Sequence, residues 1–367
     1  MKITLRIQIL PDTDQTAKLK AIMERFNAAA NWVVGEPFAG KVTNKIAAQE
    51  LLYTQVRERF GLGAQTAILC IHRAVEAYKR DTAILPDFRP DAAITYDVRT
   101  LSFKGPDRVS MLTLSGRIVV PFLMAGYQAE RIGYPKGQSD LIRSHDGKWF
   151  LLVTVTVPDG TEVPITDFLG VDLGIATIAT DSDGERHSGK SVEDVRRKHN
   201  LQRRRLQRKG TKGAKKKLRR VSKNEARFRR HENHRISKEI VETARCTGRG
   251  IAVEDLKGIR ERVTARGGDA RNRLSGWSFH QIYTFLAYKA QIAGIPVVQV
   301  DPAYTSQTCP ECGHCERSNR RSQSEFRCQR CRHEQHADVV GARNIRDAAL
   351  MEWGSGRSKP ASGLDSR

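Results

Sequence analysis

The segment at residues 168–174, FLGVDLG, places one carboxylate inside an apolar run. A short apolar run bounded by glycine is typical of a buried strand. Leu169, Val171 and Leu173 flank Asp172, and an ionised carboxylate is costly to bury among such side chains unless it is paired or bound to a metal. Asp172 therefore marks either a strand end or a functional site.

Two further buried strands are expected downstream, in GIAVEDL at 250–256 and IPVVQV at 295–300. The segment IATIATDSDG and a return strand near residues 185–187 indicate a strand meander. Helical patterns near 191–246 and 278–293, and another beginning near 337, separate or follow these strands. Strands that alternate with helices predict an α/β unit from residue 164 onward.

The first half has a different pattern. Residues 3–9 alternate as a half-buried strand, and helical spacing follows over residues 11–81. Strands separated by turn signals occupy about 92–157, and Asp146-Gly147 indicates a hairpin. We expect a small antiparallel barrel or sheet from residues 1–10 and 82–163, interrupted by the helical insertion at 11–81.

Composition excludes several classes of protein. The 367 residues suffice for two or three domains. No apolar stretch approaches the ~20 residues that span a bilayer, and the start of the chain lacks the apolar core of a signal peptide. Five of the seven cysteines cluster, which indicates a metal site in a reducing compartment rather than disulfides. We therefore expect a cytoplasmic protein without a membrane partner.

The net charge of +22 indicates a polyanionic partner. Residues 196–235 hold 19 lysines and arginines and two glutamates, a net charge of +17. A solvated helical face usually mixes signs, and a membrane-surface helix needs a large apolar face, so nucleic acid is favoured. The predicted contacts are Arg203, Arg204, Arg205, Lys215, Lys216, Lys217, Arg227, Arg229 and Arg230.

Cys309, Cys312, Cys328 and Cys331 form two C-x2-C pairs with 15 residues between them. This spacing is typical of a structural tetrahedral Zn²⁺ site of the ribbon type. Cys315, His314 and His333 are competing ligands, although a four-thiolate site needs no fifth. The segment at 304–334 is therefore expected to be a zinc ribbon.

Two more carboxylates resemble Asp172 in placement. Glu254 ends the strand IAVEDL, and Asp255 points to the opposite face, so only one of them can join a shared site. Asp338 lies at a helix start, where it could be a simple N-cap. Together, Asp172, Glu254 and Asp338 favour a Mg²⁺ site for phosphodiester hydrolysis.

The order of these motifs resembles the TnpB family of transposon-associated, RNA-guided DNA endonucleases, which are related to compact type V CRISPR effectors. The matching stretches are GVDLGIATIAT, NHRISKEIV, VEDLKG, WSFHQI, DPAYTSQTCPECG, FRCQRC and HADVVGARNI, within residues 168–347. The first half matches only in layout.

The resemblance implies an RNase H-like (RuvC) nuclease domain at 164–303 and 335–350 with an inserted zinc ribbon, and a preceding wedge-like β-barrel with a recognition insertion. Independently of the resemblance, the composition of the end of the chain predicts a disordered tail at 351–367. The resemblance also implies that Asp172, Glu254 and Asp338 are catalytic Mg²⁺ ligands. The implied partners are guide RNA and target DNA, in the nucleoid of a prokaryote.

Three alternatives stay open beside this expectation. A type V CRISPR effector would share the fold and differ in the source of its guide. A guide-bound repressor would not cleave, but repressor-like members of the family lose one or more of the three acids, and this chain keeps them. A strand-joining transposase ranks lower, because the family assigns transposition to a different protein.

Overall fold

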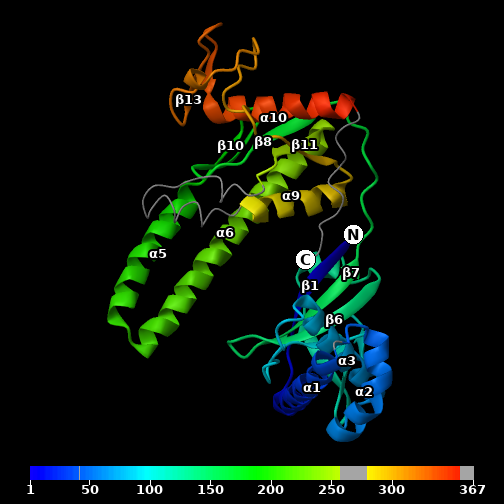
Figure 1. Cartoon of the computed structure of the whole chain (residues 1–367). Helices are drawn as coiled ribbons and strands as arrows, with labels where there is room; N and C mark the ends of the chain where they lie inside the picture. The colour runs from blue at the N-terminus through cyan, green and yellow to red at the C-terminus, as the bar shows by residue number, and fades with distance from the viewer. Residues whose placement is uncertain (41, 257–278, 356–367) are drawn as a thin grey trace. The chain divides into compact units, whose positions relative to one another are not determined.

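The computed structural model describes residues 1–40, 42–256 and 279–355, apart from the side chains at 36–39. The chain divides into two compact units, Met1–Val157 and Pro158–Arg367. Figure 1 shows them in blue to green and in green to red. In the part of the chain that is described, no helix has the length and hydrophobicity to cross a bilayer. The Gly/Arg-rich sequence at 258–276, which predicts a loop, lies outside the described residues.

The first unit is built on a seven-stranded antiparallel sheet in the order β2-β6-β7-β1-β5-β4-β3. Its strands are β1 (Lys2–Ile9), β2 (Ile94–Tyr96), β3 (Leu101–Lys104), β4 (Arg108–Thr113), β5 (Gly116–Leu123), β6 (Lys136–Arg143) and β7 (Trp149–Thr156). Strand β1 pairs with β7 along its whole length and with β5 at its end. The predicted hairpin joins β6 to β7, and Gly147 takes the left-handed conformation (φ 85°) that the turn needs.

The helical insertion of this unit consists of α1 (Thr13–Gly40), α2 (Lys45–Phe60) and α3 (Ala64–Arg80). A single turn, α4 (Gly126–Ala129), follows β5. Phe26 of α1 and Cys70 of α3 belong to the same buried core as Leu5 and Leu151 of the sheet. The helices and strands therefore stabilise each other as one unit, with Cys70 as a buried apolar side chain.

The second unit is built on a five-stranded sheet in the order β10-β9-β8-β11-β12. The strands are β8 (Phe168–Asp172), β9 (Thr177–Asp181), β10 (Arg186–Ser188), β11 (Gly250–Glu254) and β12 (Val297–Val300). Strand β11 runs parallel to both β8 and β12, whereas β8, β9 and β10 form an antiparallel meander. The predicted mixture of strands and helices is confirmed as a mixed α/β fold.

Helices cover both faces of this sheet. Leu169, Val171 and Val253 pack against α6 (Lys212–Thr247) and α9 (Phe279–Ala293). Phe168 and Ala252 pack on the other face, against α10 (Ala337–Gly354). Because side chains alternate along a strand, the even-numbered residues of β8 and β11 point towards α10.

The remaining elements project from this core. Helix α5 (Lys190–Lys209) and α6 form an antiparallel hairpin joined at Gly210, and Figure 1 shows its tip extending away from the sheet. A small ribbon contains η1 (Arg317–Asn319), β13 (Glu325–Arg327) and β14 (Glu334–His336), and it leads directly into α10. The tail predicted from residue 351 is wrong at its start, because α10 continues to Gly354; residues 356–367 are not described.

The sequence from Pro158 to Pro164 predicts a linker, but in the structure this segment is held by the second unit. Gly160 N donates to Gln291 O at 3.0 Å, and Val163 N donates to Gly294 O at 3.0 Å. A Cβ at Gly160 would lie 2.2 Å from Gly294 N, so this close approach requires glycine. The boundary between the units therefore follows Val157 rather than residue 163.

Candidate active site

Three carboxylates from distant parts of the chain face the same region of the second unit. Asp172 ends β8 and Glu254 ends β11, and the two parallel strands are paired one residue earlier, at Val171 and Val253. Both acids are at even positions, so both point to the face that α10 covers. Asp338 is the second residue of α10. The fold thus gathers three acids that lie 82 and 84 residues apart in the chain.

Helix α10 reaches this face because β8 has no side chain at Gly170. A Cβ there would lie 2.0 Å from Ala342 O, which is far inside van der Waals contact. One turn from Asp338, a Cβ on Gly341 would lie 3.2 Å from Asp172 Oδ2. Two glycines at the crossing therefore let the helix bring Asp338 towards Asp172.

Asp338 does not cap its helix. The cap is His336, whose Nδ1 accepts a hydrogen bond from Asp338 N at 3.3 Å. The Asp338 side chain is 19% exposed, and its Oδ1 lies 3.8 Å from Arg320 Nη2. The Asp338 carboxylate is therefore not used as a helix cap, and it can act in the same region as Asp172 and Glu254.

The electrostatics of the three acids are coupled. Burial, followed by the neighbouring charges of Glu254 and Asp338, raises the pKa of Asp172 to about 7, against the lowering effect of Arg320. Burial also raises the pKa of Glu254, while a hydrogen bond from Thr305 and the charge of Arg320 lower it. Such mutual repulsion is relieved when a cation binds between the carboxylates.

Arg320 is a residue of this region that the sequence did not single out. It follows η1 in the ribbon and has no motif of its own among the many arginines of the segment. Its charge acts on Asp172 and Glu254, and its guanidinium approaches Asp338. The ribbon therefore contributes a cation to the acidic site.

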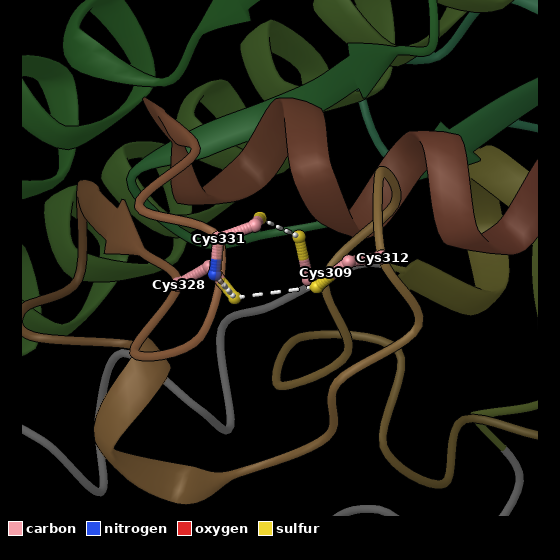
Figure 2. A group of neighbouring side chains, drawn as sticks. All are labelled: Cys309, Cys312, Cys328 and Cys331. Carbon is pink, nitrogen blue, oxygen red and sulfur yellow. Dashed lines mark hydrogen bonds between the residues drawn. The ribbon is translucent and has the colours of Figure 1, made fainter.

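Four cysteine side chains meet in the ribbon (Figure 2). Their sulfur atoms all lie within 4.8 Å of one another, and the pairs Cys309–Cys331 and Cys312–Cys328 are each 3.6 Å apart. Among the described residues this is the one such tight set of metal-ligating side chains; the three acids do not form another.

The competing ligands lie outside this set. Cys315 is exposed and bridges to Thr308 through its backbone. His314 Nε2 pairs with Glu316 Oε2 at 3.1 Å, and His333 lies 3.4 Å from the amide oxygen of Gln335. The predicted four-cysteine group is therefore the one that the fold assembles.

The predicted nucleic-acid contacts lie on the α5–α6 hairpin and differ in exposure. Seven of the nine are exposed: Arg204, Arg205, Lys215, Lys216, Lys217, Arg227 and Arg230. Arg203 is half-buried and paired with Glu225, and Arg229 is also half-buried. Near the base of the hairpin, Glu193 forms ion pairs with Arg196 and Arg197. The tip of the hairpin keeps its surplus positive charge.

Two family models match this chain. One, described as a probable transposase, matches residues 151–259, and the other, described as a Cas12f1-like TNB domain, matches residues 279–345. The chain is 30% identical to the InsQ protein of Escherichia coli K12 over 303 residues, which cover 77% of this chain and 72% of InsQ. This chain belongs to the TnpB family.

Longer relatives also match parts of this chain. The chain is 32% identical over 230 residues to Cas12f1 of Syntrophomonas palmitatica and 34% identical over 217 residues to Cas12f1 of Sulfoacidibacillus thermotolerans. These alignments cover 58% and 54% of this chain but only 45% and 50% of the relatives. The chain thus spans about half the length of these relatives.

Two solved structures share the fold at low sequence identity. Cas12f1, in complex with single-guide RNA and target DNA, matches 89% of this chain with a TM-score of 0.65 and 16% identity. CasPhi-2, bound to crRNA and phosphorothioate-DNA, matches 95% of this chain with a TM-score of 0.59 and 10% identity. They share the mixed α/β, multidomain architecture of this family member.

Proposed function

We propose that this protein is an RNA-guided, Mg²⁺-dependent DNA endonuclease of the transposon-associated type. The observation that carries the proposal is the convergence of Asp172, Glu254 and Asp338 from two strand ends and a helix start. Relatives support it by name, since Cas12f1 is called a CRISPR-associated endodeoxyribonuclease and InsQ an RNA-guided DNA endonuclease.

The domain assignment follows from the same reasoning. The second unit is proposed to be an RNase H-like (RuvC) nuclease domain, because acids at the ends of neighbouring parallel strands face a helix that carries the third. The ribbon that leads into α10 is proposed to be its inserted zinc ribbon. The first unit, with its antiparallel sheet and helical insertion, corresponds to a wedge-like domain with a recognition insertion.

The three acids are the proposed ligands of Mg²⁺. Carboxylate oxygens are the donors that this ion prefers, and the pKa of Asp172 is raised first by burial and then by the charges of Glu254 and Asp338, which a bound cation would offset. Mg²⁺, when bound, supplies charge stabilisation and water activation for phosphodiester hydrolysis. Arg320 would hold the scissile phosphate from the ribbon side, because its guanidinium already lies beside Asp338.

Zn²⁺ is the proposed ion of the cysteine group. Four sulfur atoms placed tetrahedrally at Zn–S distances of about 2.3 Å lie about 3.8 Å from one another. The distances of 3.6 Å between paired sulfur atoms fit that geometry. The metal would fix the ribbon, and through β14 the start of α10, rather than take part in chemistry.

The α5–α6 hairpin is the proposed contact for the backbones of guide RNA and target DNA. Between Arg204 and Lys223 the chain carries eleven lysines and arginines and no acid. Such a surface binds phosphates without reading bases, so sequence would be read by pairing between guide and target.

The test uses the full chain expressed with its flanking DNA. RNA that copurifies is sequenced, and the protein–RNA complex is given a matching DNA in Mg²⁺. We expect guide-dependent cleavage by the wild type, and binding without cleavage by Asp172→Ala. Cleavage by D172A at the wild-type rate would refute the site assignment, and guide-dependent binding without wild-type cleavage would favour the repressor.

The similarity to Cas12f1 supports one second candidate, a compact CRISPR effector. The copurified RNA separates the two, because a CRISPR guide would include sequence from a repeat array, whereas a transposon-associated guide would include sequence from a transposon end.

A further inference from the structure

The loop between β12 and the first cysteine pair supplies a hydroxyl to the acidic site. Thr305 is 8% exposed, and its Oγ1 lies 2.5 Å from Glu254 Oε1 and 3.2 Å from Pro302 O. A hydroxyl has one proton to donate, and a charged acceptor at the shorter distance takes it. Thr305 therefore donates to the Glu254 carboxylate.

The loop that presents Thr305 is held from α10. Asn344 Nδ2 donates to Thr305 O at 2.6 Å and to Thr308 O at 2.8 Å. Asp338, Gly341 and Asn344 recur every third residue, so they lie along one side of α10. The side of the helix that carries one acid thus fixes the loop that contacts another.

The backbone beside Thr305 is constrained as well. Tyr304 has a φ of 63°, in the left-handed region that non-glycine residues rarely adopt, although its side chain is 65% exposed. Its carbonyl accepts hydrogen bonds from Gln307 N and Thr308 N at 2.9 and 3.1 Å. A conformation of this kind persists only where surrounding contacts impose it.

We propose that Thr305 is a positioning residue that fixes the Glu254 carboxylate in the orientation that receives the catalytic ion. The inference rests on the function proposed above. Hydrogen bonds to the outer side of a ligating carboxylate orient it, and their loss typically lowers metal affinity or activity by about 10–100-fold. Because Asn344 holds the loop through backbone atoms, a change of the Thr305 side chain removes the hydroxyl and leaves the loop tied to α10.

The experiment compares four variants of the full chain with the wild type. Thr305→Val removes the hydroxyl at nearly constant volume, and Thr305→Ser restores it. Thr308→Val is the matched control, because its hydroxyl donates to Tyr304 O in the same loop, away from Glu254. Asp172→Asn removes a proposed ligand. Mn²⁺ binding is measured by titration on the protein alone, and single-turnover cleavage is measured against Mg²⁺ concentration.

We expect T305V to weaken Mn²⁺ binding and to raise the half-saturating Mg²⁺ concentration by about 10–100-fold. T305S and T308V should stay close to the wild type, with DNA binding and zinc content unchanged in all three. Wild-type Mn²⁺ binding by T305V, or equal losses in T305V and T308V, would overturn the positioning role.

Failure of the inference and failure of the proposed function give different results. Weak Mn²⁺ binding by T305V together with a wild type that never cleaves would uphold the positioning role and refute the nuclease. Wild-type Mn²⁺ binding and cleavage by T305V, together with an inactive D172N, would refute the positioning role and uphold the nuclease.

Discussion

Replacing Asp172 by asparagine should abolish cleavage and at the same time stabilise the Mg²⁺-free protein at neutral pH. Burial, followed by the charges of Glu254 and Asp338, raises the pKa of Asp172 from 3.8 to about 7. The folded state therefore holds this proton more tightly than the unfolded state does. Stability that is present below pH 3.8 is lost as the pH rises towards 7. Because asparagine carries no charge, the D172N variant should not lose stability over this pH range.

The magnitude follows from the shift in pKa. Each unit corresponds to about 1.4 kcal/mol, so the stability advantage of D172N should grow by about 3 kcal/mol between pH 4 and pH 7. For a domain of the size of the second unit, that corresponds to a rise of about 6–12 °C in melting temperature. Mg²⁺ at ten times its dissociation constant should return about 1.4 kcal/mol to the wild type and nothing to the variant.

The assay is chemical denaturation from pH 4 to pH 7.5 in Mg²⁺-free buffer, without a chelator that would strip the cysteine group. Glu185→Gln is the control, since it neutralises an exposed carboxylate in the turn between β9 and β10. Its curve should follow the wild type. Parallel curves for D172N and the wild type would refute the reasoning, because they would mean that Asp172 does not ionise in a buried site beside other acids.

Three further predictions test other parts of the molecule. Cys328→Ser should release zinc and loosen the ribbon, whereas Cys315→Ser should keep the metal, as measured by elemental analysis; equal zinc in both would contradict the four-cysteine site. Changing the lysines at 215–217 to glutamine should reduce the slope of log affinity against log salt by about 2, since each lost phosphate contact removes about 0.7–0.9, and an unchanged slope would exclude the hairpin tip. Gly170→Ala should cost about 1–3 kcal/mol of unfolding free energy and most of the cleavage activity, because a Cβ would push α10 and its carboxylate away; a variant of wild-type stability and rate would show that this crossing is not needed.

The sequence by itself determined the features that depend on local spacing. The two cysteine pairs, the apolar strands with a carboxylate at the end of each, and the concentration of positive charge can all be read from neighbouring residues. The alternation of side chains also separated Glu254 from Asp255 before any tertiary contact was known. Local periodicity suffices for these because strand and helix geometry repeat over a few residues.

Only the tertiary structure decided which distant groups meet. Nothing local shows that α10 crosses β8 at Gly170, that Arg320 of the ribbon lies beside Asp338, or that Thr305 donates to Glu254. The tertiary structure also pairs Arg203 with Glu225 and leaves the tip of the α5–α6 hairpin exposed. These contacts depend on how elements far apart in the chain pack, and packing is set by the shape and burial of whole faces rather than by the spacing within any one of them.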